Sequence, residues 1–332
     1  MNGILGLENG RTGTYLTTKG GAILKKIIIL ALAAAMSAGV TACAKKPAAE
    51  EHGAHEHEAA EGTAFLHIHG LGYSRDGERL YIPVHNGIKI YAGGAWSDAP
   101  GDKHDYMGFS AADNGFYSSG HPAEGTRYKN PLGLIRSTDE GQSITVLALE
   151  GEVDLHGMAV SYRTHTLYAL NPEPNSKMKQ QGLFYSRDEG KTWTPAAMAG
   201  VSGQITSLAV HPSDDKISAI GTTAGTYVSR DYGQTYAQLD PKPASALTFT
   251  DQGELLIGST GAVELRKVNP GTGQAESWKP ASAGEAITYI SANPADPKKA
   301  AYTTEKKNVY VTSDGGATWT QIAEEGQAAD GK

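Results

Sequence analysis

Short runs of apolar and β-branched residues follow one another along most of the chain, from about residue 65 onward, and turns rich in Gly, Asp and Pro separate them. Runs of this kind predict β-strands rather than helices. One stretch illustrates the pattern, with expected strands at 205–210, 216–222, 225–229 and 234–239. The 41 glycines among 332 residues agree with an all-β chain that has many tight turns.

An eight-residue signature, Ser/Thr-x-Asp-x-Gly-x-Thr/Ser-aromatic, recurs in the same region. Its acidic residues are spaced by 49, 43 and 83 residues, and the last interval corresponds to two periods of about 41 residues. A degenerate copy of the signature is therefore expected at 268–278, and another upstream at 91–96. The chain then holds six units. The four clear copies centre on Asp139, Asp188, Asp231 and Asp314, and two of them end in Trp193 and Trp319.

A four-stranded sheet that recurs every 40 to 50 residues is typical of a propeller blade. The sequence therefore predicts a six-bladed β-propeller of four-stranded antiparallel blades over residues 64–324. On this division each blade is contiguous, and the ring closes without a swapped strand. An offset of one strand, with the N-terminal strand completing the last blade, remains an alternative. The expected blades are 65–100, 102–149, 153–199, 204–240, 244–280 and 285–322, followed by a disordered tail at 325–332.

The signature resembles the Asp-box, or BNR, repeat of sialidases, sortilin-type receptors and many bacterial propellers. In that family the box forms the turn between the third and fourth strands of a blade, on the face opposite the usual binding mouth. The residue chemistry agrees with a structural role, because a short Asp side chain can cap backbone N–H groups while Gly accepts a positive φ. The aromatic residue of the box is expected to pack between neighbouring strands.

The N-terminal region has the three parts of a signal peptide at 25–43: two lysines, an apolar run at 27–36, and small residues before Cys43. The last four residues of this segment resemble the bacterial lipobox, in which the cysteine is acylated. We therefore expect an extracytoplasmic protein that is anchored to the bacterial membrane through Cys43. The alternative is a lone buried cysteine after an apolar helix. Residues 1–24 fit no part of a signal peptide, which indicates a start codon assigned too far upstream.

Residues 44–63 are rich in Ala, Glu, Lys and His and carry no apolar face, so they predict a flexible tether. Three histidines of the tether, His52, His55 and His57, could bind Zn²⁺ or Cu²⁺ weakly. The alternative is a solvated spacer that binds no metal. The net charge is −7 and no stripe of Lys and Arg follows the N-terminus, which argues against nucleic acid as a partner. We expect a monomer.

Histidines gather where the innermost strands of the first three expected blades begin, at the face where propeller ligands usually sit. Two more histidines fall in connections between second and third strands, which add to the same face. Imidazole is the commonest metal ligand, so the cluster predicts a Zn²⁺ or Cu²⁺ site, with histidines that merely cap strand ends as the alternative. The candidate ligands are His67, His69, His85, His104, His121 and His156, and Asp105 is the alternative to His104 beside His69 and His156.

The chain also resembles bacterial lipoproteins labelled as glycosyl hydrolases, but the sialidase site is absent. Tyr81 stands where a sialidase has the arginine of its Arg-Ile-Pro segment, and no arginine triad can be assembled. Asp105 and Asp154 are the candidate catalytic carboxylates of a different glycosidase. Three functions therefore stay open: a metal-dependent ligand-binding propeller, a hydrolase of extracellular glycans, and an assembly factor that docks a protein over the rim.

Overall fold

All regular structure in the described part of the chain is β-strand, as the short apolar runs predict. The computed structural model describes residues 65–259, 264–281 and 284–329. The predicted signal peptide, Cys43 and the tether lie outside these residues. Within the described residues, no helix is long and apolar enough to cross a membrane.

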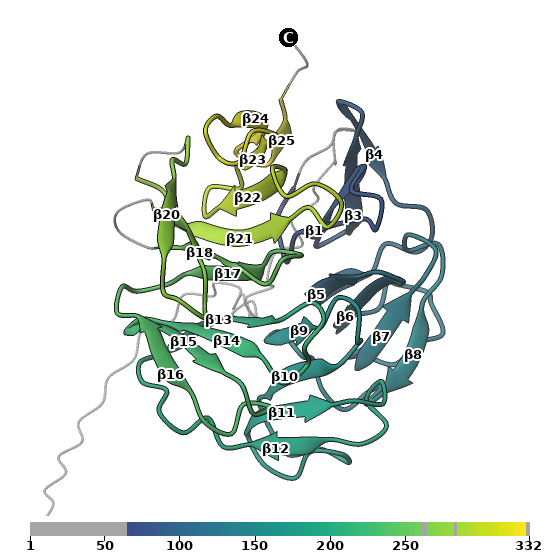
Figure 1. Ribbon diagram of the computed structural model, residues 1–332. Helices are drawn as coiled ribbons and strands as arrows, with labels where there is room; N and C mark the ends of the chain where they lie inside the picture. The colour runs from purple at the N-terminus through teal and green to yellow at the C-terminus, as the bar shows by residue number, and fades with distance from the viewer. Residues whose placement is uncertain (1–64, 260–263, 282–283, 330–332) are drawn as a thin grey trace, which may run out of the picture. The chain divides into compact units, whose positions relative to one another are not determined.

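Six antiparallel sheets form six blades around a common centre, and each blade is built from consecutive strands (Figure 1). The innermost strands are β1 (Gly72–Tyr73), β5 (Asp105–Ala112), β9 (Met158–Val160), β13 (Ile205–Val210), β17 (Ala246–Phe249) and β21 (Ile287–Ala292). The second strands are β2 (Arg79–Val84), β6 (Gly115–His121), β10 (Leu167–Asn171), β14 (Ser218–Thr222), β18 (Leu255–Gly258) and β22 (Ala300–Thr304).

The outer half of each blade holds the third and fourth strands in the same order. The third strands are β3 (Gly87–Ala92), β7 (Leu134–Ser137), β11 (Gly182–Ser186), β15 (Gly225–Ser229), β19 (Leu265–Val268) and β23 (Val309–Thr312). The fourth strands are β4 (Ala95–Asp98), β8 (Thr145–Ala148), β12 (Thr194–Ala196), β16 (Ala237–Asp240), β20 (Ala275–Trp278) and β24 (Thr320–Glu324). The predicted six-bladed propeller is confirmed.

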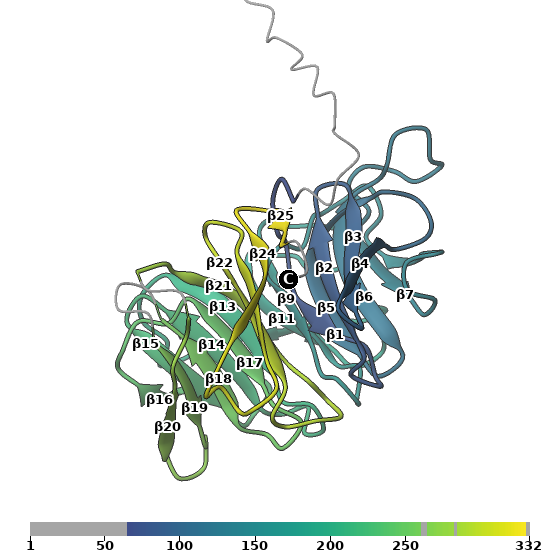
Figure 2. The same ribbon diagram turned by 90° about the horizontal axis from the view of Figure 1, so that it is seen from above.

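The core of the propeller lies between its blades. Six clusters of buried apolar residues each combine side chains from two neighbouring blades, and together they fill the six interfaces around the ring. The turned view shows the sheets of successive blades packed against one another (Figure 2). Burial of these apolar faces is the main favourable term that holds the ring together.

The ring closes by contacts between blade six and blade one rather than by a swapped strand. Phe65 N–H donates to the carbonyl oxygen of Gly326 at 2.6 Å, and Trp96 Nε1–H donates to that of Ile322 at 3.2 Å. A short extra strand, β25 (Gln327–Ala328), pairs with β24. Part of the expected disordered tail is thus ordered, because β24 offers it open backbone groups at the edge of the blade.

The four clear Asp-boxes all lie between the third and fourth strands of their blades, as predicted. In the last box, Asp314 accepts hydrogen bonds from Thr318 Oγ1 at 2.6 Å, from Thr318 N at 3.0 Å and from Thr312 Oγ1 at 2.8 Å. These bonds hold the pKa of its carboxyl down at about 2. The equivalent bond from the backbone N–H four residues on recurs at Asp139, Asp188 and Asp231.

The aromatic residues of the boxes pack against the interfaces between blades. Trp193 contacts the cluster between blades two and three, and its Nε1–H donates to the Gly190 carbonyl oxygen at 3.1 Å. Trp319 packs edge-on against Tyr302, with ring centroids 4.7 Å apart. In the degenerate copy of blade five, Pro270 stands at the aspartate position, and the preceding residue caps the turn instead, because Asn269 Oδ1 accepts from the N–H of Thr272 at 3.0 Å. The boxes are therefore structural elements.

Candidate metal centre

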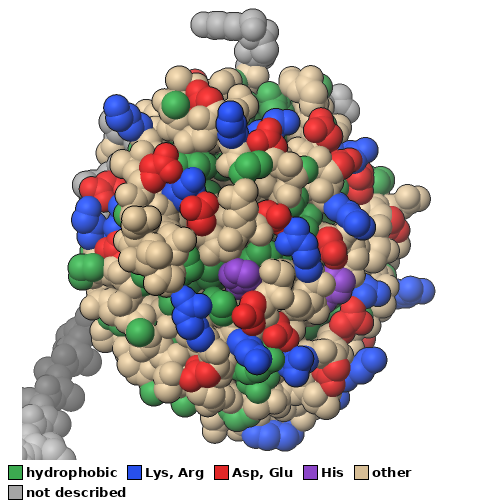
Figure 3. Space-filling model, viewed as in Figure 1, with side chains coloured by type: hydrophobic (Ala, Val, Ile, Leu, Met, Phe, Trp, Pro, Cys, Tyr) green, Lys and Arg blue, Asp and Glu red, His purple; other side chains and the backbone are tan. Residues whose placement is uncertain are grey.

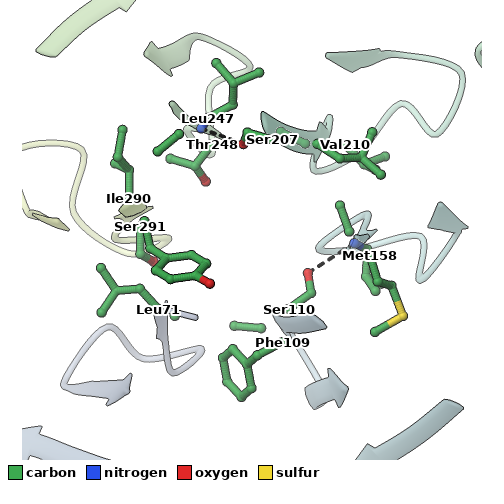
Figure 4. A pocket seen from close by; sticks show the side chains of 18 of the residues that line it. Leu71, Phe109, Ser110, Met158, Ser207, Val210, Leu247, Thr248, Ile290 and Ser291 are labelled. Atoms are coloured by element: carbon green, nitrogen blue, oxygen red, sulfur yellow. Dashed lines mark hydrogen bonds between the residues drawn. The ribbon is translucent and has the colours of Figure 1, made fainter. Parts of the chain in front are cut away.

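The innermost strands enclose a channel with a cavity of about 420 Å³. Its wall combines apolar side chains, such as Leu71, Phe109 and Ile290 in Figure 4, with hydroxyl and other polar groups. Two hydroxyl groups in the wall serve the fold, because Ser110 Oγ accepts from Val160 N at 3.1 Å and Ser207 Oγ accepts from Leu247 N at 2.9 Å. We call the end of the channel lined by His69 and His156 the channel mouth.

The end of the channel away from these histidines is bridged across blades. The Arg163 guanidinium, in the turn after β9, pairs with the Asp251 carboxylate, in the turn after β17. Arg163 N–H also donates to the carbonyl oxygen of Pro212 at 2.8 Å, in the intervening blade. The buried Tyr162 hydroxyl lies in the same region and has no hydrogen-bond partner among the described residues.

Three side chains at the channel mouth, which we call the first group, place ligand atoms within 4.8 Å of one another: His69, His85 and Asp105. The His85 Nδ1 atom lies 2.8 Å from Asp105 Oδ2. The His69 Nε2 atom lies 3.4 Å from Asp105 Oδ1, and neither of these two buried atoms has a hydrogen-bond partner among the described residues. Two imidazole nitrogens and one carboxylate oxygen form a donor set suited to Zn²⁺ or Cu²⁺.

The strand order explains how distant residues reach one point. Asp105 is the first residue of β5 in blade two, and His85 lies in the turn between β2 and β3 of blade one. His69 precedes β1, and its N–H donates to the Pro83 carbonyl oxygen at 2.9 Å, which fixes it beside that turn. All three positions lie where strands meet the same face of the ring.

Burial sets the charge state of His69. Removal from water is the largest effect and lowers the pKa of its imidazole, whereas the Asp105 carboxylate raises it. The nearby imidazoles of His67, His85 and His156 lower the pKa further. His69 is thus held toward the neutral form, which is the form that binds a metal ion.

A second trio of predicted residues meets on the next blade, and we call it the second group: His121, Asp154 and His156. The His156 Nε2 atom lies 2.6 Å from Asp154 Oδ2, and the His121 Nε2 atom lies 3.3 Å from the same oxygen. The predicted cluster is therefore divided into two groups, and each group has a carboxylate between two imidazoles.

Two predicted ligands do not join either group. His104 is buried, and its Nδ1 accepts a hydrogen bond from the N–H of Ala123 at 2.9 Å. Its ring packs edge-on against Tyr106 and Tyr128, so its role is structural. His104 and Asp105 are adjacent, and Asp105 takes the position at the mouth. His67 is exposed, and its ring centre lies 6.1 Å from that of His69.

Sequence reasoning missed Asn130, whose side-chain Oδ1 lies 2.7 Å from His121 Nδ1. Asn130 belongs to the connection between β6 and β7, which returns to the mouth only in the folded chain. No motif marks it in the sequence, because an asparagine before a proline in a loop is typical of turns in general.

Comparisons with known proteins agree with the fold. Residues 184–195 match the family described as BNR/Asp-box repeat. The chain therefore carries an Asp-box repeat. A curated relative, a xyloglucanase of Hypocrea jecorina (strain QM6a), is 29% identical over 108 residues, which are 32% of this chain and 12% of that protein.

Two solved structures resemble this Asp-box propeller. The GH74 enzyme of Niastella koreensis matches with a TM-score of 0.55 at 17% identity over 79% of this chain and 45% of that one. The GH74 xyloglucanase from Xanthomonas campestris matches with a TM-score of 0.50 at 17% identity over 79% of this chain and 46% of that one. The chain spans less than half the length of these proteins, and the likeness shows the fold alone.

The surface of the propeller carries charges of both signs. In the direction of Figure 3, acidic and basic side chains are interspersed, with hydrophobic side chains between them. This face therefore does not present a field of one sign, of the kind that steers polyanions such as nucleic acids.

Proposed function

We propose that this protein is an extracytoplasmic, membrane-tethered propeller that binds Zn²⁺ or Cu²⁺ at its channel mouth. The observation that carries the proposal is the first group, in which His69, His85 and Asp105 bring their ligand atoms within 4.8 Å of one another. A structural zinc site has four ligands, whereas a site with three protein ligands keeps a position for water or another molecule. That open position would face the channel mouth.

The burial of the first group supports the proposal. The Asp105 side chain is 9% exposed, and its Oδ1 accepts no hydrogen bond from the described residues, which is costly for a carboxylate unless a cation lies nearby. The His69 Nε2 atom, 3.4 Å from Asp105 Oδ1, likewise has no hydrogen-bond partner in the described part of the chain. A bound metal ion would satisfy both atoms at once.

The location rests on the N-terminal sequence. The apolar run at 27–36 and the small residues before Cys43 support export and lipid attachment. A tether at 44–63 would hold the propeller at a distance from the membrane, with its channel mouth open to ions outside the cell.

Zinc affinity of the full chain tests the proposal. The chain should first carry His52→Ala, His55→Ala and His57→Ala, because the tether imidazoles would bind metal independently. In this background we expect His69→Ala and His85→Ala each to raise the Kd for Zn²⁺ at least about tenfold, the lower end of what loss of even an outer partner costs. Competition with a chromogenic chelator measures the change.

The matched control is His165→Ala. His165 Nε2 also lies beside a carboxylate, at 2.6 Å from Asp113 Oδ1, but at the opposite end of β5 from Asp105. We expect this variant to bind Zn²⁺ like its parent. An unchanged Kd in both His69→Ala and His85→Ala would contradict the proposal.

A glycoside hydrolase is the second candidate, because the curated relative with 29% identity over 108 residues is a xyloglucanase. Asp105 and Asp154 would be the two carboxylates, placed at the starts of the inner strands of consecutive blades. Such a pair can act as acid and base, or as acid and nucleophile, depending on its separation.

Release of reducing ends from xyloglucan and other β-glucans tests this candidate. We expect Asp105→Asn and Asp154→Asn each to lower kcat/KM about 100-fold or more, as loss of a general acid or base does. Asp113→Asn is the control, because Asp113 follows the far end of β5. A wild-type chain that releases no reducing ends from any of these glycans would exclude the hydrolase.

A further inference from the structure

The second group has the same kinds of side chain as the first, one blade further along the ring, although among the described residues only the first group brings all of its ligand atoms within 4.8 Å of one another. In both groups a histidine comes from the second-to-third strand region of one blade, and the carboxylate comes from the start of the next blade. His85 and Asp105 have these places in the first group, and His121 and Asp154 have them in the second. The third member of the second group, His156, is two residues after Asp154.

The two groups are joined through one pair of strands. Asp105 of the first group and His121 of the second are register partners across β5 and β6, so their side chains stand on the same face of the sheet. The N–H of Leu155, next to Asp154, donates to Ser119 Oγ at 2.9 Å, which ties the second carboxylate to β6 as well. Both His69 and His156 line the same cavity.

The hydrogen bonds around His121 leave one nitrogen directed at a carboxylate. Its Nδ1 lies 2.7 Å from the amide oxygen Oδ1 of Asn130, an arrangement in which Nδ1 carries the proton and donates. The Nε2 atom then faces Asp154 Oδ2 at 3.3 Å: as imidazolium it donates a second proton to this carboxylate, and as the neutral ring it turns a lone pair toward it that a metal ion can share. A carbonyl oxygen that fixes the far nitrogen is also the usual outer partner of a metal-bound histidine.

One oxygen of the Asp154 carboxylate is free to bind an ion. Its Oδ1 is buried and has no hydrogen-bond partner within residues 65–259, 264–281 and 284–329, although the carboxylate is the only acidic member of the group. The side chains of His121 and His156 are 43% and 65% exposed, so an ion can reach them from solvent.

We propose that His121, Asp154 and His156 form a second site for Zn²⁺ or Cu²⁺, so that the channel mouth binds two ions on consecutive blades. The inference rests on the proposed function, because the first group defines the kind of ion and the face that it occupies. Asn130 is a positioning residue that orients His121. A divalent transition-metal ion is the ligand class that two imidazoles and one carboxylate select.

Zinc stoichiometry of the full chain tests the second site. The chain again carries His52→Ala, His55→Ala and His57→Ala, and metal analysis after dialysis against ZnCl₂ is paired with calorimetric titration. We expect two ions per chain in this parent, one after His69→Ala with His85→Ala, and one after His121→Ala with His156→Ala. Unchanged thermal unfolding shows that a variant is folded. His121→Gln with His156→Gln replaces the alanine pair if that pair does not fold.

The outcomes separate the two proposals. One ion in the parent that survives His121→Ala with His156→Ala overturns the second site and leaves the first. One ion that survives His69→Ala with His85→Ala but is lost with the other pair overturns the first site and supports the second. If the parent binds one ion, and each of the two double variants loses it, both groups belong to a single shared site. This result overturns the two-ion inference. No bound ion in the parent overturns both.

Discussion

Replacement of Gly120 by alanine is expected to destabilise the propeller by about 3 to 5 kcal/mol and to weaken zinc binding. Gly120 has a φ of 117°, which L-residues with a side chain rarely adopt. A Cβ atom there would lie 1.9 Å from the Asp105 carbonyl oxygen and 2.9 Å from Met107 N. The strands β5 and β6 would have to separate at the point where they carry Asp105 and His121.

Chemical denaturation measures the loss of stability, and Gly125→Ala is the matched control. Gly125 has a φ of 78° in the connection that follows β6, but a Cβ atom there would meet nothing within 4 Å. Only the backbone strain remains, so we expect a cost of about 1 kcal/mol and unchanged zinc binding. Equal stability losses in the two variants would show that close approach to Asp105 is not the cause.

Replacement of Tyr168 by alanine is expected to cost about 4 kcal/mol of stability. Tyr168 lies in β10, is fully buried and belongs to the cluster between blades three and four. Its hydroxyl donates to the carbonyl oxygen of Asp215, in the neighbouring blade, at 2.6 Å. The alanine variant loses both the packed ring and this bond, so it leaves a cavity at an interface between blades.

Tyr168→Phe separates the two contributions, because it keeps the ring and removes only the hydroxyl. We expect it to cost about 1 to 2 kcal/mol, the usual effect of a lost hydrogen bond that leaves its partner unsatisfied. Tyr185→Ala is a second control, since Tyr185 is the cross-strand partner of Tyr168 but is only half-buried. A phenylalanine variant as unstable as the alanine variant would contradict the assignment of most of the energy to ring packing.

The repeat architecture was predictable because its information is local. In the last Asp-box, Asp314 bonds to residues no more than four positions away, so eight residues suffice to specify the turn. Turns of this kind at regular spacing also fix how many strands each unit holds. The blade count and the structural role of Asp314 followed from these patterns without any tertiary contact.

The grouping of the candidate ligands was not predictable to the same degree. His104 and Asp105 are neighbours at the start of one strand, and neighbouring strand residues point to opposite sides. The sequence left both as alternatives for the same place, and the register of β5 with β6 decides between them. His85 was predicted at this face, but its partner Asp105 was decided by the fold, and Asn130 reaches its place through loop geometry for which the sequence carries no comparable signal.

Taken alone, the sequence determined the all-β class, the six blades and the turn chemistry, because these depend on patterns that repeat within a few tens of residues. Tertiary structure decided which histidine meets which carboxylate, that β25 adds a fifth strand beside β24, and that the predicted cluster is two groups. These features depend on strand register and on packing between blades, which bring together residues such as His69 and Asp105 from separate blades.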